Sequence, residues 1–168
     1  NEGGIVCQWM PIYQMSPARL RSAMKTFQDV FPHATFWYVM NHGLFVAKLD
    51  SPLIDYTLLQ DKFGKPGIRK DLASIDIHSP EAFLELLLMG PDEISAFVND
   101  GDAIPVNTDD YPYLESFVPG DLFYQPLANV REINNHLIDP VTLVINQPEA
   151  SVTAVRAAVK DRAQRLVS

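Results

Sequence analysis

The N-terminal part of the chain carries the feature that most limits the fold, which is a strand pattern followed by a helix pattern and two further strand patterns. Residues 5–9 form a short apolar run before Pro11, which is typical of a buried strand. Ser16 and Pro17 begin a helix pattern, because serine can cap free N–H groups and proline fits the first helical position. Pro32 ends it. This order predicts an α/β fold.

The helix predicted for residues 17–31 has one apolar face, made of Leu20, Ala23, Met24, Phe27, Val30 and Phe31, with Arg19, Arg21 and Lys25 off that face. Residues 34–40 and 44–49 are rich in aromatic and β-branched side chains. Asn41-His42-Gly43 between them is turn chemistry, so we predict an antiparallel hairpin. We expect strand 5–9 to lie beside the hairpin and to run parallel to one of its strands.

The second half of the chain is predicted to be mostly helical. Serine-proline or glycine-proline pairs at 51–52, 79–80 and 90–91 each indicate a helix start. Helices are expected at about 53–63, 68–74, 80–89, 91–98, 122–138 and 151–167, with extended structure around 114–118 and a break at 139–140. The last helix has an apolar stripe, Val152, Val155, Val159, Ala163 and Leu166. Its partner is either residues 127–137, as a helical hairpin, or a bare face of the sheet, and we favour the hairpin.

Charge and cysteine content exclude some classes of protein. The net charge is −8 and the pI about 4.8, so nucleic acid is not an expected partner, because phosphate binding requires a basic surface. An acidic surface favours a cationic ligand, although it also serves solubility alone. Cys7 is the single cysteine, which excludes a disulfide framework and favours a reducing, cytoplasmic compartment. No apolar run approaches the ~20 residues that span a bilayer.

Common catalytic and cofactor motifs are missing from the sequence. It has no G-x-G-x-x-G or phosphate loop, and no serine in a nucleophile-elbow context. Its histidines, His33, His42, His78 and His136, lack metal-ligand spacing. Cys7 in mid-strand is predicted to be a small buried hydrophobe. We therefore predict no metal, no bound cofactor and no catalytic residue within these 168 residues.

Two polar features remain as candidate binding residues. Gln8 ends an apolar strand, where an unpaired amide is costly, so it either faces a ligand crevice or is satisfied by neighbouring backbone. The stretch "NTDDYPYLE", residues 107–115, places Asp109 and Asp110 beside Tyr111. Carboxylates next to aromatic faces suit a protonated amine. The same residues also suit an ordinary turn, with Asn107 or Asp109 capping backbone.

Two separated segments resemble one family. "GGIVCQWMPIYQMSPARLRSAMKTFQDVFPHATFW" is similar to the latter part of the spermidine synthase-like family, in the bacterial branch often fused to membrane segments or helical repeats. The matching residues are Gly3, Gly4, Gln8, Trp9, Pro11, Tyr13, Ser16, Pro17, Val30, Phe31 and Pro32. The second segment matches the "NTDD-x-P-x-L-E" element of that branch through Asn107, Thr108, Asp109, Asp110, Pro112, Leu114 and Glu115. The resemblance covers about residues 3–120.

The resemblance implies the C-terminal portion of a Rossmann-like, methyltransferase-type sheet, with residues 4–9 as the fifth of seven strands. It implies a spermidine synthase-like domain over residues 1–121 and a helical tail over 122–168. Gln8 would lie near a polyamine, together with Asp109, Asp110 and Tyr111. The glycine-rich loop, the acidic residue for the ribose and the aspartate pair that serve the donor in the family are absent. Decarboxylated S-adenosylmethionine, or S-adenosylmethionine, is thus implied for the full parent alone.

The predicted function follows from that part of the family. We expect the acceptor-side half of a polyamine aminopropyltransferase-like protein, inactive alone, that self-associates or pairs with a missing N-terminal half. The alternative is a non-catalytic, methyltransferase-derived interaction module of a membrane-associated protein, of which this would be the cytoplasmic domain. An intact glycine-rich loop and aspartate pair upstream would favour the enzyme, and their decay would favour the module.

Overall fold

The computed structural model describes residues 3–12, 15–40, 42–115 and 126–167, and their side chains except those of 126–128 and 163–167. The chain divides into two compact units. Unit 1 holds residues 1–52 and 88–138, and unit 2 holds residues 53–87 and 139–168. The predicted boundary at residue 121 followed the extent of the family resemblance, which this grouping of contacts does not test.

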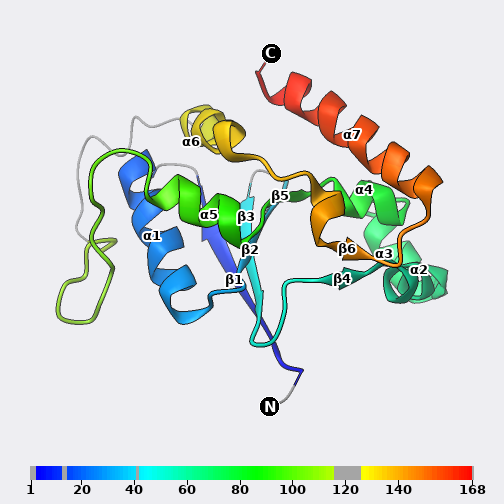
Figure 1. The fold of residues 1–168 in the computed structure, drawn as a ribbon, viewed down its shortest axis with the longest axis horizontal. Helices are drawn as coiled ribbons and strands as arrows, with labels where there is room; N and C mark the ends of the chain where they lie inside the picture. The colour runs from blue at the N-terminus through cyan, green and yellow to red at the C-terminus, as the bar shows by residue number, and fades with distance from the viewer. Residues whose placement is uncertain (1–2, 13–14, 41, 116–125, 168) are drawn as a thin grey trace. The chain divides into compact units, whose positions relative to one another are not determined.

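The sheet of unit 1 has four strands in the order β1-β3-β2-β5 (Figure 1). They are β1 (Ile5–Pro11), β2 (Thr35–Val39), β3 (His42–Lys48) and β5 (Leu87–Met89). β3 is antiparallel to both β1 and β2, so β1 runs parallel to β2. The predicted antiparallel hairpin and the predicted direction of strand 5–9 are confirmed. The chain is a mixed α/β structure with an antiparallel sheet.

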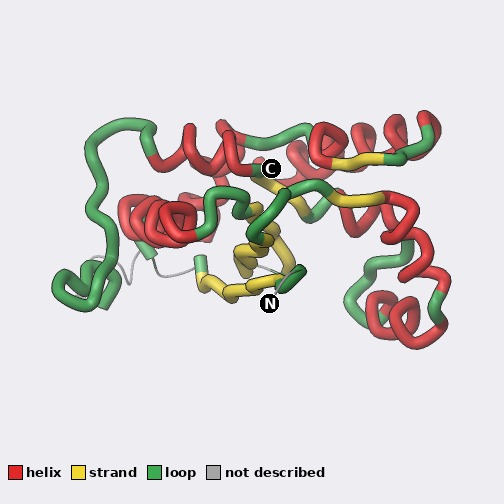
Figure 2. Tube along the Cα trace, turned by 60° about the horizontal axis from the view of Figure 1, so that its bottom comes forward, coloured by secondary structure: helices red, strands yellow, loops and turns green. Residues whose placement is uncertain are grey.

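Helix α1 (Pro17–Val30) covers one face of this sheet. Its Leu20 and Met24 are fully buried, and the ring of Phe27 stacks on that of Phe45 in β3 at 4.8 Å between centroids. Helices α5 (Pro91–Val98) and α6 (Pro126–Ile133) pack against α1. Figure 2 shows the helices of unit 1 on one side of its strands. The predicted apolar stripe is correct through Phe27, but Val30 is exposed because α1 ends there.

Strand β1 is exposed, which corrects the prediction of a buried strand at residues 5–9. The exposed fractions are 65% for Ile5 and 48% for Trp9, and the described part of the chain pairs β1 with β3 alone. Cys7 is exposed as well, so the prediction that it is a small buried hydrophobe is wrong. An apolar strand is buried only where a neighbouring strand and covering helices surround it. β1 is instead an uncharged, apolar edge.

Unit 2 is a small helical unit around a short parallel pair of strands, β4 (Ile54–Asp55) and β6 (Val144–Ile145). Its helices are α2 (Tyr56–Gly64), α3 (Pro66–Ala73), α4 (Pro80–Leu84), the 3-10 helix η3 (Pro140–Leu143) and α7 (Glu149–Val167). Its core joins Tyr56, Leu84 and Val155. Val155 and Val159 of the α7 stripe lie in this core, and α7 contacts α4 and η3. The hairpin favoured for α7, with residues 127–137, would join α7 to unit 1 and stays a prediction, since the contacts described for α7 lie within unit 2.

Three local expectations differ from the structure. The helix predicted over 80–89 ends at Leu84, and residues 87–89 form β5, because an apolar run of this length does not distinguish a buried helix from a strand. The turn predicted at residues 41–43 comes earlier in the chain, since His42 and Gly43 belong to β3. Of the extended structure predicted around 114–118, residues 113–115 form a turn and the rest lies outside the described residues.

Gly43 is needed for space and not for a turn. A Cβ atom built on it would lie 2.5 Å from the fully buried ring of Phe36, which lies diagonally across the hairpin, since Gly43 itself is paired with Tyr38. Real Cβ contacts are essentially never that short. The glycine therefore leaves room for the Phe36 ring beside β3.

Candidate functional site

The segment 104–115 is a loop that hydrogen bonds hold against α1. The Ser22 hydroxyl donates to the Pro105 carbonyl at 2.7 Å, and the Thr26 hydroxyl accepts from the Asn107 N–H at 2.8 Å. Further along, Arg19 Nη1 donates to the Leu114 carbonyl at 2.9 Å. Successive turns of one helix thus anchor both ends of the loop.

The loop also satisfies its own backbone. The side-chain oxygen of Asn107 accepts from the Leu114 N–H at 2.8 Å, which closes the loop across its base. Thr108 and Tyr111 exchange two backbone hydrogen bonds of 3.1 Å, and the Thr108 hydroxyl accepts from the Tyr111 N–H. Asn107 therefore caps backbone, as the turn interpretation predicted, and the capping role offered for Asp109 falls to Thr108.

Asp109, Asp110 and Tyr111 lie together at the exposed tip of this loop. The rings of Tyr111 and Tyr113 stack nearly parallel, with 6.3 Å between centroids and 13° between planes. The guanidinium carbon of Arg19 lies 5.8 Å from the Tyr113 centroid, so the inner ring is already occupied by a cation. Within the described residues the two carboxylates have no partner. The tip thus offers two free carboxylates and the outer tyrosine ring to a ligand.

Gln8 lies apart from this loop. It faces Phe45 across the β1–β3 pair, and its amide donates to the carbonyl of the adjacent Trp9 at 2.8 Å. That bond matches the interpretation in which neighbouring backbone satisfies the glutamine. The described contacts do not join Gln8 to Asp109, Asp110 or Tyr111. The structure therefore brings together the three loop residues and leaves Gln8 as a separate exposed amide.

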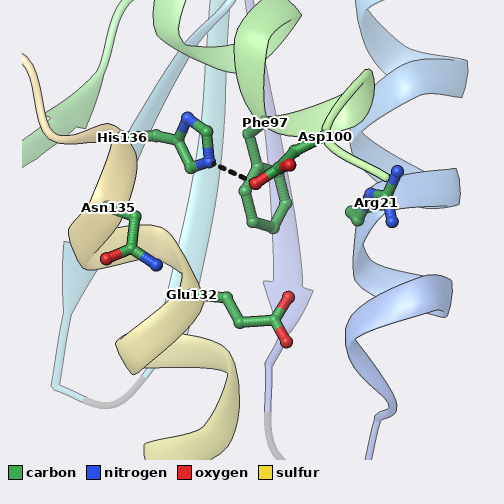
Figure 3. Close-up of a pocket in the computed structure, with 6 residues that line it drawn as sticks. All are labelled: Arg21, Phe97, Asp100, Glu132, Asn135 and His136. Atoms are coloured by element: carbon green, nitrogen blue, oxygen red, sulfur yellow. Dashed lines mark hydrogen bonds and ion pairs between the residues drawn. The ribbon is translucent and has the colours of Figure 1, made fainter. Parts of the chain in front are cut away.

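A second polar feature of unit 1 is a cavity of about 330 Å³ between α1, α5 and α6 (Figure 3). We call it the polar cavity. Its lining residues are Arg21, Phe97, Asp100, Glu132, Asn135 and His136. His136 belongs to the 3-10 helix η2 (Asn134–His136), and its Nε2 lies 3.2 Å from an Asp100 oxygen. The His136 ring also meets Phe97 edge-on at 5.6 Å between centroids.

Arg21 fixes the opposite wall of the polar cavity. Its Nη2 donates to the carbonyls of Val98 at 3.3 Å and Asp102 at 3.0 Å, which ties the end of α5 to α1. Gly101 has φ 87°, a left-handed conformation that glycine adopts freely, and it allows the turn between Asp100 and Asp102. Sequence reasoning placed Arg19 and Arg21 off the apolar face and assigned them no role. Both bind backbone carbonyls far away in the chain, which no local pattern reveals.

The pKa shifts lie outside these two features. In unit 2, the Glu81 carboxylate accepts hydrogen bonds from the Tyr56 and Ser151 hydroxyls. Burial alone would raise the pKa of Glu81, but these bonds, with others from Ser79 and backbone, outweigh burial and lower it. The pKa of Tyr56 is raised by burial first and then by Glu81. Burial also raises the pKa of Tyr38.

The described residues include no group of three or more histidine, cysteine, aspartate or glutamate side chains that could hold a metal ion. Across the same residues, no helix is long and apolar enough to cross a membrane. A comparison with family models finds no match, and comparisons with curated proteins and with solved structures find none either.

Proposed function

We propose that this chain is the acceptor-side half of a polyamine aminopropyltransferase-like, that is spermidine synthase-like, protein of the cytoplasm. In this proposal the loop tip with Asp109, Asp110 and Tyr111 binds a cationic amine. The observation that carries it is that a loop anchored to α1 at both ends leaves two adjacent carboxylates without partners among the described residues, beside the exposed Tyr111 ring that stacks on Tyr113. A fixed loop with unused acceptors is organised for a ligand and not for its own stability.

The exposed edge strand β1 supports the proposal that this sheet is one half of a larger sheet. β1 is uncharged, apolar and exposed, although natural edge strands are usually protected by charge, proline or cover. Such a strand is the expected boundary where a larger sheet continues. The "GGIVCQW" and "NTDDYPYLE" resemblances agree with this position, since they belong to the latter part of the spermidine synthase-like domain.

Aminopropyl transfer requires few catalytic groups on the side of the protein that binds the acceptor amine. The nitrogen of a neutral amine would attack the methylene next to the donor's sulfonium. The new C–N bond would replace the C–S bond, a neutral thioether would leave, and the ammonium formed would release one proton. The acceptor side would therefore position the amine and hold its charged end elsewhere. Asp109 and Asp110 would hold the distal ammonium of a diamine. The side-chain oxygen of Gln8 would be a second hydrogen-bond acceptor for the amine. The described residues have no glycine-rich loop between a strand and a helix that would fit the sulfonium donor.

Equilibrium dialysis of the full chain against radiolabelled 1,4-diaminobutane tests the proposal. Each exposed ion pair contributes roughly 0.7 kcal/mol, so replacing both carboxylates, D109N together with D110N, should weaken binding about tenfold. The control replaces two exposed aspartates of unit 2, D61N together with D71N, which changes the net charge equally and should keep the affinity. Equal losses in both variants would show that the diamine responds to net charge alone.

A second function is favoured by the exposed edge itself. A non-catalytic interaction module would use β1 to pair with another chain, and Ile5, Val6 and Trp9 are all exposed for that purpose. This candidate predicts association through β1 without amine binding at the loop. Light scattering together with the dialysis experiment separates the two functions.

A further inference from the structure

The polar cavity goes beyond the proposed function and carries an inference of its own. Hydrogen bonds hold two of its lining residues, Arg21 and His136, in place. Arg21 ties the end of α5 to α1 through two carbonyls, and His136 joins η2 to Asp100 at 3.2 Å. The His136 side chain is only 16% exposed, and it leans on the buried ring of Phe97. A cavity held in this way binds a ligand without first paying for its own ordering.

Polar groups remain unused around the cavity. The Glu132 carboxylate, from α6, and the Asn135 amide, from η2, have no hydrogen-bond partner among the described residues. Arg21 uses Nη2 for the two carbonyls, and its Nε is buried without a partner in the described structure. In Figure 3 the Glu132 side chain extends from α6 toward the wall that carries Arg21. No ion pair joins the two in the described structure, so their charges remain open to a ligand.

We infer that the polar cavity binds a small zwitterion, a molecule with an ammonium group and a carboxylate on a short chain. The ammonium would bind to Glu132, with Asp100 beside it, and the carboxylate would bind to the Arg21 guanidinium and the Asn135 amide. Charge-assisted hydrogen bonds of this kind are about twice as strong as neutral ones. The volume of about 330 Å³ lies near the lower end of ligand cavities, which span ~300–1,000 Å³.

The arrangement of charge gives the selectivity. A dication would place one ammonium against Arg21, and a simple carboxylic acid would face Asp100 and Glu132 without a counter-charge. A zwitterion alone satisfies both walls. This separates the polar cavity from the loop tip at residues 107–113, where two carboxylates favour a molecule with positive charge only.

Three probes with the same four-carbon chain test the inference on the ¹⁵N-labelled full chain: 4-aminobutyrate, 1,4-diaminobutane and butyrate. We expect 4-aminobutyrate to shift the signals of Asp100, Asn135 and His136 saturably. It should bind there about tenfold more tightly than either other probe, since each lacks one charge-assisted contact. Failure of the amine-binding proposal would appear instead at residues 107–113, so the two proposals fail independently.

Glu132→Gln keeps the shape of the side chain and removes its charge, and it should weaken 4-aminobutyrate about tenfold. Glu132 is exposed, so the variant should fold, which its spectrum will show. The matched control is Glu149→Gln, an exposed glutamate of unit 2, which should bind as the unaltered chain does. The inference is overturned if 4-aminobutyrate gives no saturable shift, if butyrate or 1,4-diaminobutane binds equally well, or if Glu132→Gln has no effect.

Discussion

Removing the hydroxyl of Tyr56 should destabilise unit 2 in a way that depends on pH. Tyr56 is 5% exposed, and its hydroxyl donates to Glu81, which also accepts from Ser151 at 2.7 Å. A hydrogen bond to a charged group contributes about 1.5–3 kcal/mol. Glu81 is only partly buried, so solvent screening places the loss for Tyr56→Phe near the lower end, at about 1.5 kcal/mol. For a chain of this length the melting temperature should fall by about 3–6 °C.

The sign of the pH dependence follows from the two pKa shifts. The folded pKa of Glu81 lies below 4.5, so its stabilisation is present above that pH and is lost as pH falls through the folded value. The pKa of Tyr56 is raised above 10.0, so its hydroxyl contributes fully below pH 10 and loses that contribution as pH rises through the folded value. Between those limits the bond joins a neutral donor to a charged acceptor.

Thermal unfolding followed by circular dichroism, at neutral pH and again in acid, measures this effect. The deficit of Tyr56→Phe should shrink in acid toward the ~0.5–1.5 kcal/mol of a neutral bond. Tyr111→Phe is the control, because Tyr111 is 58% exposed and should change stability by less than about 0.5 kcal/mol. A deficit of equal size at both pH values would refute the reasoning, since the acceptor's charge would then make no contribution.

The remaining predictions concern packing and association. Gly43→Ala should cost about 1–3 kcal/mol in urea unfolding, because the new methyl group would clash with the buried Phe36 ring, and an unchanged midpoint would contradict this contact. Val155→Asp buries a charge in the core of unit 2, so amide exchange should become faster in α7 while β2 stays protected. Loss of protection in both α7 and β2 would show that α7 unfolds together with the sheet. Light scattering should show self-association of the chain, and Val6→Lys should reduce the average mass because it adds a charge to the β1 edge. A monomer at high concentration would contradict association through β1.

Local pattern was enough to predict most elements of the structure. The proline at the start of α1, the periodic apolar face through Phe27 and the β-branched hairpin strands each specify a conformation over short distances. α5 was expected at residues 91–98 and is found there, because Gly90 and Pro91 mark its start and Glu93 caps the Gly90 N–H at 3.0 Å. In such segments propensity and packing agree.

The failures arose where burial depends on distant parts of the chain. β1 has the composition of an interior strand, but its exposure is decided by which strands are beside it, and no residue of β1 encodes that. For the same reason, residues 87–89 were predicted as the end of a helix and form the strand β5 instead. The contacts of α7 within unit 2 are also long-range, because α4 comes from a separate part of the sequence.

In the candidate site, too, the local residues were predicted from the sequence and the long-range contacts were not. The residues of the tip, Asp109, Asp110 and Tyr111, were recognised from their chemistry, and the loop does bring them together. Its anchors on α1 were not predicted, because Arg19 binds a carbonyl ninety-five positions away. The polar cavity was missed for that reason too, since Arg21, Asp100 and Glu132 come from three separate segments.

Residue-resolved mapping of 1,4-diaminobutane on the ¹⁵N-labelled chain tests the central claim, that the loop tip is the acceptor side of an aminopropyltransferase-like protein. The account predicts saturable shifts at Thr108, Asp109, Asp110, Tyr111 and Tyr113, whose midpoint moves to about tenfold higher diamine concentration when both aspartates are replaced by asparagine. Shifts spread evenly over the acidic surface, or confined to other residues, would contradict it.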